Sequence, residues 1–163
     1  MCYNTDMKIV ETENLEALSA LASAIVKEYY DPIVGAAQND YMIARFQSVE
    51  GIRRQVAEGY RYYVLCEEQP VGFLGFYPRG DELYLSKLYL RKEARGKGYG
   101  RAAFAFLKGE AEKVGLRKIT LNVNKYNPTI QIYEKLGMKQ VRAEVNDIGG
   151  GYVMDDYVYS LVW

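Results

Sequence analysis

The stretch Arg91–Phe104, RKEARGKGYGRAAF, restricts the fold more than any other part of the chain. Its glycines stand at alternate positions, Gly96, Gly98 and Gly100, with basic residues between and around them. A strand-like run precedes the stretch and a helix-like run follows it. The first turn of such a helix presents unpaired N–H groups, and glycines allow a ligand to approach this backbone closely. The sequence therefore predicts an anion site for phosphate or pyrophosphate.

Two common phosphate-binding patterns do not fit this turn. A Walker A loop needs Gly-Lys-Ser/Thr, whereas Lys97 is followed by Gly98 and Tyr99. The dinucleotide pattern fails because RAA follows Gly100, and the next strand, KITLNVN, lacks the acidic residue that would bind ribose. A solvated basic loop is the bland alternative, but the flanking strand and helix favour a phosphate site.

Composition removes several other classes of function. Lys plus Arg equals 21 and Asp plus Glu equals 21, so the net charge of zero argues against a nucleic-acid partner. The chain has no histidine, which excludes Ser-His chemistry, and Cys2 and Cys66 have no metal-site spacing, so we expect no metal. No apolar run reaches the ~20 residues that span a bilayer. We expect a cytoplasmic protein without a membrane partner, folded as one domain over residues 1–163.

The hydrophobic periodicity predicts an α+β (mixed α/β) domain in three layers. Expected helices cover residues 13–30, 41–46, 49–59, 98–114 and 127–136, and Asp31-Pro32 is expected to end the first of them. Expected strands are Lys8–Glu11, Arg61–Glu67, Val71–Tyr77, Glu82–Leu90, Lys118–Asn124, Met138–Val145 and Tyr152–Val162. Antiparallel hairpins are thus combined with one strand–helix–strand crossover.

The pattern Arg-x-x-Gly-x-Gly, formed by Arg95, Gly98 and Gly100 after LYLSKLYLRKEA, resembles the acetyl-CoA motif of the GNAT N-acetyltransferase superfamily. A second block, LNVNKYNPTIQIYEKLGM, is similar to the downstream signature of that family through Asn127 and Tyr133. Ile130 and Ile132 depart from its usual small and aromatic residues. The resemblance covers residues 7–162.

The resemblance implies a mostly antiparallel central sheet that splays into a V, with helices on both faces and a bulge near the end of the strand Glu82–Leu90. It implies that this strand pairs with the pantetheine arm of acetyl-CoA, that the N–H of Leu90 polarises the acetyl carbonyl, and that the glycine-rich turn holds the pyrophosphate. The residues implied in binding the donor are Leu88, Tyr89, Leu90, Arg95, Gly96, Lys97, Gly98, Tyr99, Gly100, Arg101 and Asn127.

The resemblance also implies direct attack of an amine on the thioester, with Tyr133 as the general acid that protonates the leaving thiolate. The chain has 16 tyrosines, and only the place of Tyr133 in the second block singles it out. The general base stays open, because Ser86 stands near the place where many relatives carry glutamate. Glu82, Glu67 or Asp155 acting through water, or an amine that arrives deprotonated, are the alternatives.

The ending DIGGGYVMDDYVYSLVW resembles bacterial acetyltransferases of the spermidine/spermine type, which implies a small amine such as a polyamine as acceptor. Carboxylates would attract a polycation, and tyrosines could contact it by cation–π interaction. The candidates are Glu28, Asp31, Asp40, Asp155 and Asp156, with Tyr29, Tyr30 and Tyr41. The alternatives are solvated carboxylates and packing tyrosines, and for function a protein N-terminal or lysine acetyltransferase or a non-catalytic acyl-CoA-binding module. By analogy with the family, a homodimer through the aromatic last strand is also expected.

Overall fold

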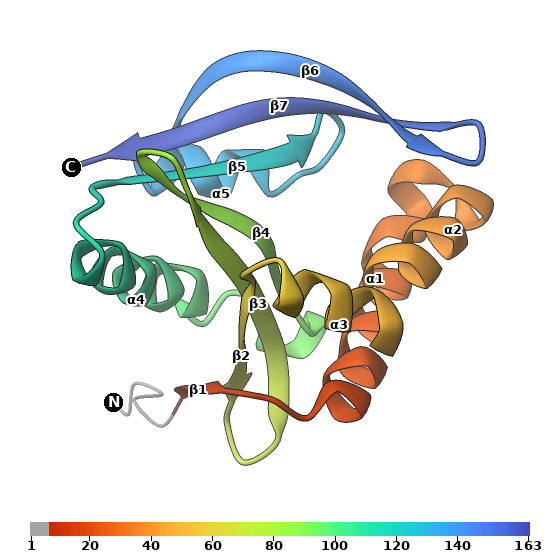
Figure 1. Cartoon of the computed structure of the whole chain (residues 1–163), viewed down its shortest axis with the longest axis horizontal. Coiled ribbons are helices and arrows are strands. Elements are labelled where there is room, and N and C mark those ends of the chain that lie inside the picture. The colour runs from red at the N-terminus through yellow and green to blue at the C-terminus, as the bar shows by residue number, and fades with distance from the viewer. Residues whose placement is uncertain (1–6) are drawn as a thin grey trace.

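A computed structural model describes residues 7–163 and contains one twisted sheet with helices on both of its faces (Figure 1). The helices are α1 (Leu15–Val34), α2 (Ala36–Phe46), α3 (Val49–Ala57), α4 (Tyr99–Lys113) and α5 (Ile130–Lys135), with a 3₁₀ turn, η1, at Lys92–Ala94. The strands are β1 (Lys8–Glu11), β2 (Arg61–Cys66), β3 (Pro70–Arg79), β4 (Glu82–Leu90), β5 (Lys118–Asn124), β6 (Lys139–Gly149) and β7 (Tyr152–Val162).

The strands lie in the order β1-β2-β3-β4-β5-β7-β6, and β4 with β5 is the parallel pair. The remaining neighbours are antiparallel. On one face, Leu18 and Ile25 of α1 and Ile52 of α3 pack with Phe73. On the other face, Phe104 and Leu107 of α4 pack with core residues of β4 and β5. The mixed α/β, three-layer prediction is therefore confirmed.

The sheet opens between its two central strands. β4 and β5 pair only through Leu83 with Ile119 and Tyr84 with Thr120, although both strands continue beyond these residues. The register of β3 against β4 shifts at Ser86, because Gly75 faces Lys87 whereas Phe76 faces Leu85. Such a bulge bends the strand that carries it. The splayed sheet is confirmed, and the bulge lies at the middle of β4 instead of near its end.

The bulge is accompanied by an unusual buried side chain, Lys87, which is 5% exposed. Its Nζ donates to the Phe46 carbonyl at 2.5 Å and to the side-chain oxygens of Gln47 and Gln55 at 2.9 and 3.0 Å. Burial lowers the pKa of Lys87 to about 7. The side chain joins β4 to the connection between α2 and α3, and so fixes this helical layer against the splayed strand.

The first helix differs from its predicted boundary, because Pro32 lies inside α1 instead of following its end. A proline in the last turn removes one backbone hydrogen bond only. The N–H of Gly35 still donates to the Asp31 carbonyl at 3.0 Å, and Gly35, at φ 87°, ends the helix. Elsewhere α2 starts earlier, β3 and β6 are longer, and α5 is shorter than predicted. These differences concern element ends, which pattern fixes least well.

Helix α2 also contacts the far end of the β6–β7 hairpin (Figure 1). The hydroxyl of Tyr41 donates to the Ile148 carbonyl at 2.7 Å, and Nε2 of Gln38 donates to the Val153 carbonyl at 2.8 Å. The rings of Tyr41 and Tyr152 lie 5.2 Å apart. These contacts connect the helical layer to the outer arm of the sheet.

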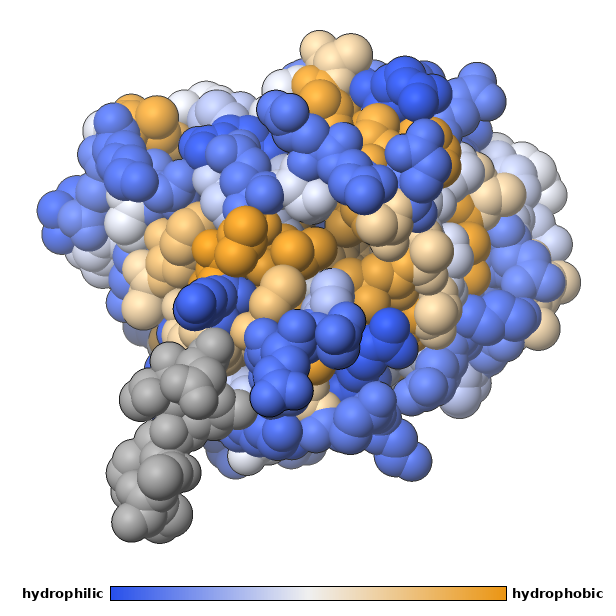
Figure 2. All heavy atoms as spheres, turned by 90° about the horizontal axis from the view of Figure 1, so that it is seen from below, coloured by the Kyte–Doolittle hydropathy of each residue, from blue (hydrophilic) through white to orange (hydrophobic). Residues whose placement is uncertain are grey.

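Two surface properties bear on the expected partners. Apolar surface gathers in the middle of the face seen from below and is bordered by hydrophilic residues (Figure 2). Among residues 7–163, no helix combines the length and the apolar character needed to span a bilayer. The last strand, β7, lies between β5 and β6, so both of its edges are paired within the sheet. The strand at this edge of the sheet is β6, and a dimer that extends the sheet here would pair through β6.

Candidate active site

The glycine-rich turn begins α4 without a capping side chain. Gly98 is the residue before the helix and is left-handed at φ 83°, and Gly96 is left-handed at φ 77°. The N–H of Ala102 makes a bond to the Gly98 carbonyl, so the N–H groups of Gly100 and Arg101 have no intrahelical partner. A Cβ placed at any of the three glycines would meet no atom within 4 Å. The open space and the exposed donors fit a phosphate group.

The basic side chains of this turn have different partners. Nε and Nη2 of Arg95 donate to the Leu90 carbonyl at 3.2 and 3.0 Å, and its guanidinium lies 4.8 Å from the centre of the Tyr29 ring. Nζ of Lys97 pairs with the carboxylate of Glu67 at 2.9 Å. Arg95 thus fastens the turn to the end of β4 and Lys97 fastens it to the end of β2. Arg101 lines the cavity described below.

The inner edge of β4 offers backbone groups to the same space. The N–H of Arg91 donates to the Val71 carbonyl at 2.7 Å, which fixes the phase of the antiparallel β3–β4 ladder. Leu88 faces Leu74 and Leu90 faces Gly72, so both stand at the alternating positions that do not bond to β3. Their N–H groups therefore point toward the side from which β5 has parted.

These elements surround a cavity of about 410 Å³. Every residue that the sequence implied in donor binding lines it except Lys97. The lining residues are Tyr29, Tyr30, Leu85, Ser86, Leu88, Tyr89, Leu90, Arg95, Gly96, Gly98, Tyr99, Gly100, Arg101, Leu121, Asn122, Val123, Asn127, Thr129, Ile132, Tyr133, Lys135 and Leu136. The cavity thus runs from the glycine-rich turn, along β4, to β5.

Tyr133 comes from α5 and lies in this lining. Its ring centre is 6.1 Å from that of Phe104 on α4, which fixes the ring against the apolar core. Burial raises the pKa of Tyr133 far above its usual value, and the nearby tyrosines add to this effect. The phenol therefore keeps its proton at every physiological pH, as a proton donor must.

Asn127 connects the cavity to α1. Its Oδ1 accepts hydrogen bonds from the hydroxyl of Tyr29 and from N and Oγ1 of Thr129, the latter two at 2.9 and 2.7 Å. Its Nδ2 donates to the hydroxyl of Tyr30 at 3.1 Å. Burial raises the pKa of Tyr30 to about 12. These bonds fix the amide in the cavity wall and bring two tyrosines from α1 to the site.

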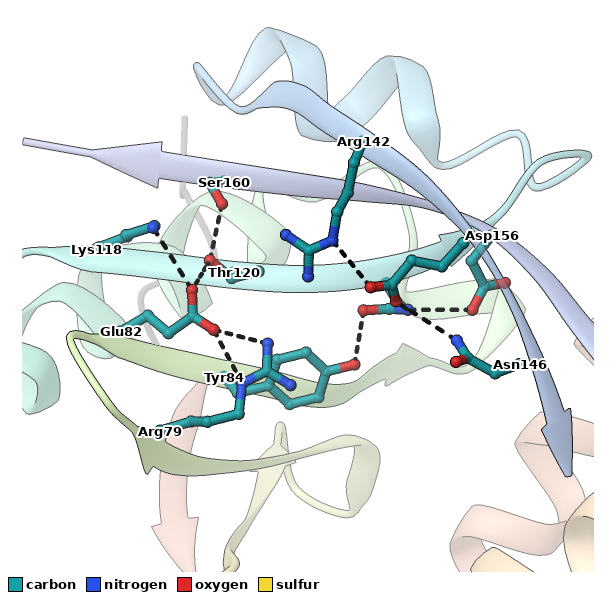
Figure 3. A network of polar contacts seen from close by, with 11 residues as sticks. Arg79, Glu82, Tyr84, Lys118, Thr120, Arg142, Asn146, Asp156 and Ser160 are labelled. Atoms are coloured by element: carbon teal, nitrogen blue, oxygen red, sulfur yellow. Dashed lines mark hydrogen bonds and ion pairs between the residues drawn. The ribbon is translucent and has the colours of Figure 1, made fainter.

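A second set of polar residues lies on the β5–β7–β6 side of the splay (Figure 3). The hydroxyl of Tyr84 donates to Oδ1 of Asn122 at 2.9 Å. Nδ2 of Asn122 donates to Glu144 at 3.0 Å and to Oδ2 of Asp156 at 3.4 Å. Asn122 lines the cavity, so this set meets its inner end. Burial raises the pKa of Asp156 to about 6.

The residues expected to bind the acceptor do not gather in one place. Tyr29 and Tyr30 line the cavity, but the other candidates do not: Glu28, Asp31, Asp40, Tyr41, Asp155 and Asp156. Glu28 is exposed. Asp31 is held by Asn39 and Lys27, which lower its pKa, and Asp155 pairs with Lys125 at 2.8 Å.

The carboxylates considered as bases are also engaged. Glu82 pairs with Arg79 at 2.6 Å, and Glu67 pairs with Lys97.

The sequence did not single out Asn122 or the inward direction of Asp156. No sequence signal gives this direction, because Val158 on the face of Asp156 and Tyr159 on the opposite face of β7 are both buried.

A splayed sheet, a cavity lined by backbone N–H groups and a glycine-rich start of a helix together define the acyl-CoA N-acyltransferase fold. Residues 21–138 match the family model described as "Acetyltransferase (GNAT) family", and the chain belongs to that family. It is 32% identical over 81 residues to the "Uncharacterized N-acetyltransferase YycN" of Bacillus subtilis (strain 168). That match covers 47% of this chain and 52% of YycN, so it spans about half the length of the curated relative.

Solved structures support the same fold at low sequence identity. The PaiA N-acetyltransferase of Thermoplasma acidophilum, in complex with coenzyme A, has a TM-score of 0.74 and 20% identity. The alignment covers 96% of this chain and 99% of that chain. A GCN5-related N-acetyltransferase of Rhodopseudomonas palustris has a TM-score of 0.81 and 14% identity, and covers 100% of this chain and 99% of that chain.

Proposed function

We propose that this protein transfers the acetyl group of acetyl-CoA to a primary amine by direct attack, and that the acceptor is a small amine such as a polyamine. The observation that carries the donor assignment is a continuous cavity that joins the first turn of α4 to the unpaired inner edge of β4. Family membership supports the same assignment. A phosphate site at one end and free backbone donors along the wall suit a long, phosphorylated thioester.

In this proposal, different residues of the cavity bind acetyl-CoA, stabilise the oxyanion and protonate the leaving thiolate. The N–H groups at the start of α4 hold the pyrophosphate, and Leu88 offers backbone hydrogen bonds to the pantetheine arm. The N–H of Leu90 polarises the acetyl carbonyl and stabilises the oxyanion that forms there. Tyr133 protonates the departing thiolate, since its phenol is protonated and lines the cavity. The other donor-binding residues implied by the sequence keep their expected roles in this proposal.

The contact between α2 and the β6–β7 hairpin supports a small acceptor. A peptide substrate needs an open groove, whereas Tyr41 and Gln38 bond to both strands of this hairpin. These hydrogen bonds connect α2 to the hairpin and so restrict the space that a peptide would need on the acceptor side. Carboxylates and tyrosines face this side from β4, β6 and β7, which suits a cationic amine.

The decisive experiment is a CoA-release assay with acetyl-CoA and a panel of acceptors: diamines, polyamines, amino acids, aminoglycosides and short peptides. We expect turnover with one or more small cationic amines and little or none with peptides. Activity with peptides alone would overturn the acceptor proposal. Tight binding of acetyl-CoA by calorimetry, without turnover of any acceptor, would instead identify a non-catalytic acyl-CoA-binding module.

A further inference from the structure

Asp156 on β7 is buried without the partner that a buried charge normally has. The residue is 1% exposed, and its Oδ1 makes no hydrogen bond with any residue of the range 7–163. The other buried carboxylate among these residues, Glu110, pairs with both Arg61 and Lys113, at 3.1 and 2.7 Å. Burying an uncompensated carboxylate costs free energy, so its presence calls for a role outside packing.

The groups that interact with Asp156 come from β5, β6, β7, α1 and β4, and among residues 7–163 no cation pairs with it. On β5, Asn122 donates to its Oδ2, and on β6 the facing residue is Glu144. Asp155 precedes it on β7, and its negative charge, like that of Glu144, raises the pKa of Asp156 further. From α1 and β4, Tyr30 and Tyr84 lie close enough for the charge of Asp156 to raise their pKa values.

The cationic side chains near Asp156 form ion pairs with other carboxylates (Figure 3). Arg142 pairs with Glu144 at 2.9 Å, and Arg79 and Lys118 pair with Glu82 at 2.6 and 3.6 Å. Lys125 pairs with Asp155. Asp156 forms no ion pair with any cation among residues 7–163, and its hydrogen-bond donor Asn122 lines the cavity, as does Tyr30.

We propose that Asp156 attracts the protonated acceptor amine to the Asn122 end of the cavity and receives, through one water molecule, the proton that the ammonium group must lose. The inference rests on the proposed acetyl transfer and deepens it, because it assigns the acceptor as an amine that arrives as a cation. Asp156 is a positioning and proton-accepting residue that does not itself touch the acetyl group.

The proton balance of the step is complete with these groups. The ammonium gives one proton to the Asp156 carboxylate, and the neutral amine then forms the C–N bond to the acetyl carbon. As the C–S bond breaks, Tyr133 gives its proton to the thiolate, and the acetylated nitrogen loses a second proton that restores Tyr133. Asp156 finally releases its proton to water, so the products are the amide, CoA thiol and one proton.

The pKa of about 6 suits this role at neutral pH. The carboxylate is ionised at pH 7 and can attract a cation, yet it is a stronger base than an exposed aspartate. The activity kcat/KM for the amine should therefore rise as the pH increases through about 6 and this group ionises.

The test compares Asp156→Asn with Asp155→Asn, because the two changes remove the same charge from adjacent residues of one strand. We expect Asp156→Asn to lower kcat/KM for the amine by about 100-fold, within the range for loss of a proton acceptor, and to remove the limb near pH 6. Asp156→Glu should restore part of the activity. At pH 8, where Asp156 is ionised in both proteins, Asp155→Asn should stay within about threefold of the parent. It should move the limb to lower pH without removing it, because the charge of Asp155 raises the pKa of Asp156.

A second readout separates this role from a structural one. With an acceptor amine of low pKa, already neutral at the assay pH, the loss in Asp156→Asn should shrink to less than about tenfold, because no proton has to be removed first. The KM for acetyl-CoA should not change, and thermal unfolding should show a folded variant. An equal loss with both kinds of amine, or an unchanged pH profile, would overturn the inference.

The failure of this inference can be told from the failure of the proposed function. If the parent protein acetylates an amine while Asp156→Asn matches it in kcat/KM and pH profile, only the role of Asp156 is wrong. If the parent binds acetyl-CoA but acetylates no amine in the panel, the proposed function itself is wrong.

Discussion

The two sides of the splayed sheet present different kinds of group to the cavity: backbone N–H groups on one side and polar side chains on the other. The proposed donor side uses the backbone: the start of α4 and the inner edge of β4 present N–H groups, and the glycines leave open space in front of them. The proposed acceptor side uses side chains, with Tyr84, Asn122 and Asp156 contributed by three different strands. The difference means that the donor side is specified by a short local sequence, whereas the acceptor side exists only after the strands have paired.

The comparison predicts that the kinetic constants for acetyl-CoA and for the amine can be changed independently. Changes on the donor side should affect acetyl-CoA binding or departure of the thiolate, and changes on the acceptor side should affect the amine. The four predictions below are ordered from the largest expected effect to the smallest.

Tyr133→Phe removes the proposed proton donor and should lower kcat by about 10²–10⁴-fold, with little change in KM for acetyl-CoA. The matched control is Tyr126→Phe, because Tyr126 is 78% exposed and lies outside the cavity lining. Steady-state CoA release over a range of pH measures both. Equal kcat in parent and Tyr133→Phe at all pH values would remove Tyr133 from the mechanism.

Gly100→Ala should raise the KM for acetyl-CoA by about tenfold or more, because its methyl group would occupy the open space in front of the helix start. Gly109→Ala is the matched control, since both glycines lie in α4 without positive φ and neither has an atom within 4 Å of the added Cβ. Both changes favour the helix by about 0.5–1 kcal/mol, so they should stabilise it similarly. The same KM for acetyl-CoA in both variants would contradict the phosphate cradle.

Tyr84→Phe deletes the hydrogen bond to Asn122 and should raise the KM for the amine by about fivefold, which corresponds to about 1 kcal/mol. The KM for acetyl-CoA should stay the same. Tyr77→Phe is the control, because the Tyr77 ring lies beside Tyr84 but its hydroxyl makes no hydrogen bond with residues 7–163. An effect on acetyl-CoA alone would show that the two sides are not separate.

Asp156→Asn should raise the melting temperature by about 2–4 °C at pH 7–8 if it removes about 1 kcal/mol of burial cost. The sign follows from a folded-state pKa raised from 3.8 to about 6: the charged form destabilises the fold above about pH 6, and this cost disappears as the pH falls toward 3.8. The gain should therefore be full at pH 8 and absent near pH 4. Thermal unfolding at both pH values measures it, and a variant less stable than the parent at pH 8 would show that Asp156 stabilises the fold.

The donor side could be predicted from the sequence because its signals are local. The glycines at 96, 98 and 100, Asn127 and Tyr133 stand in two short blocks, and all of them line the one cavity. The strand cores were also predictable, since β4, β5 and β7 were expected with the boundaries they have. The alternating pattern of these strands carried this information.

The acceptor side could not be predicted because it depends on register between strands distant in sequence. Asp156 faces Asn124 on one side and Glu144 on the other, and only this pairing decides which member of the Asp155-Asp156 pair points inward. A shift of one residue would exchange the two. In this arrangement Lys125 pairs with Asp155, and Asp156 has no cationic partner among residues 7–163.

The turn of the β6–β7 hairpin has a consequence for how this protein can diversify. Gly149 and Gly150 have φ values of 86° and 62°, and an added Cβ would lie 2.5 and 2.8 Å from the Tyr41 side chain. The turn and the helix residue thus limit each other, because a larger residue in the turn requires a smaller one on α2. Relatives that carry side chains at positions 149 and 150 should also have replaced the tyrosine at position 41. A change of acceptor that reshapes this hairpin would then have to begin in a helix more than 100 residues earlier in the chain.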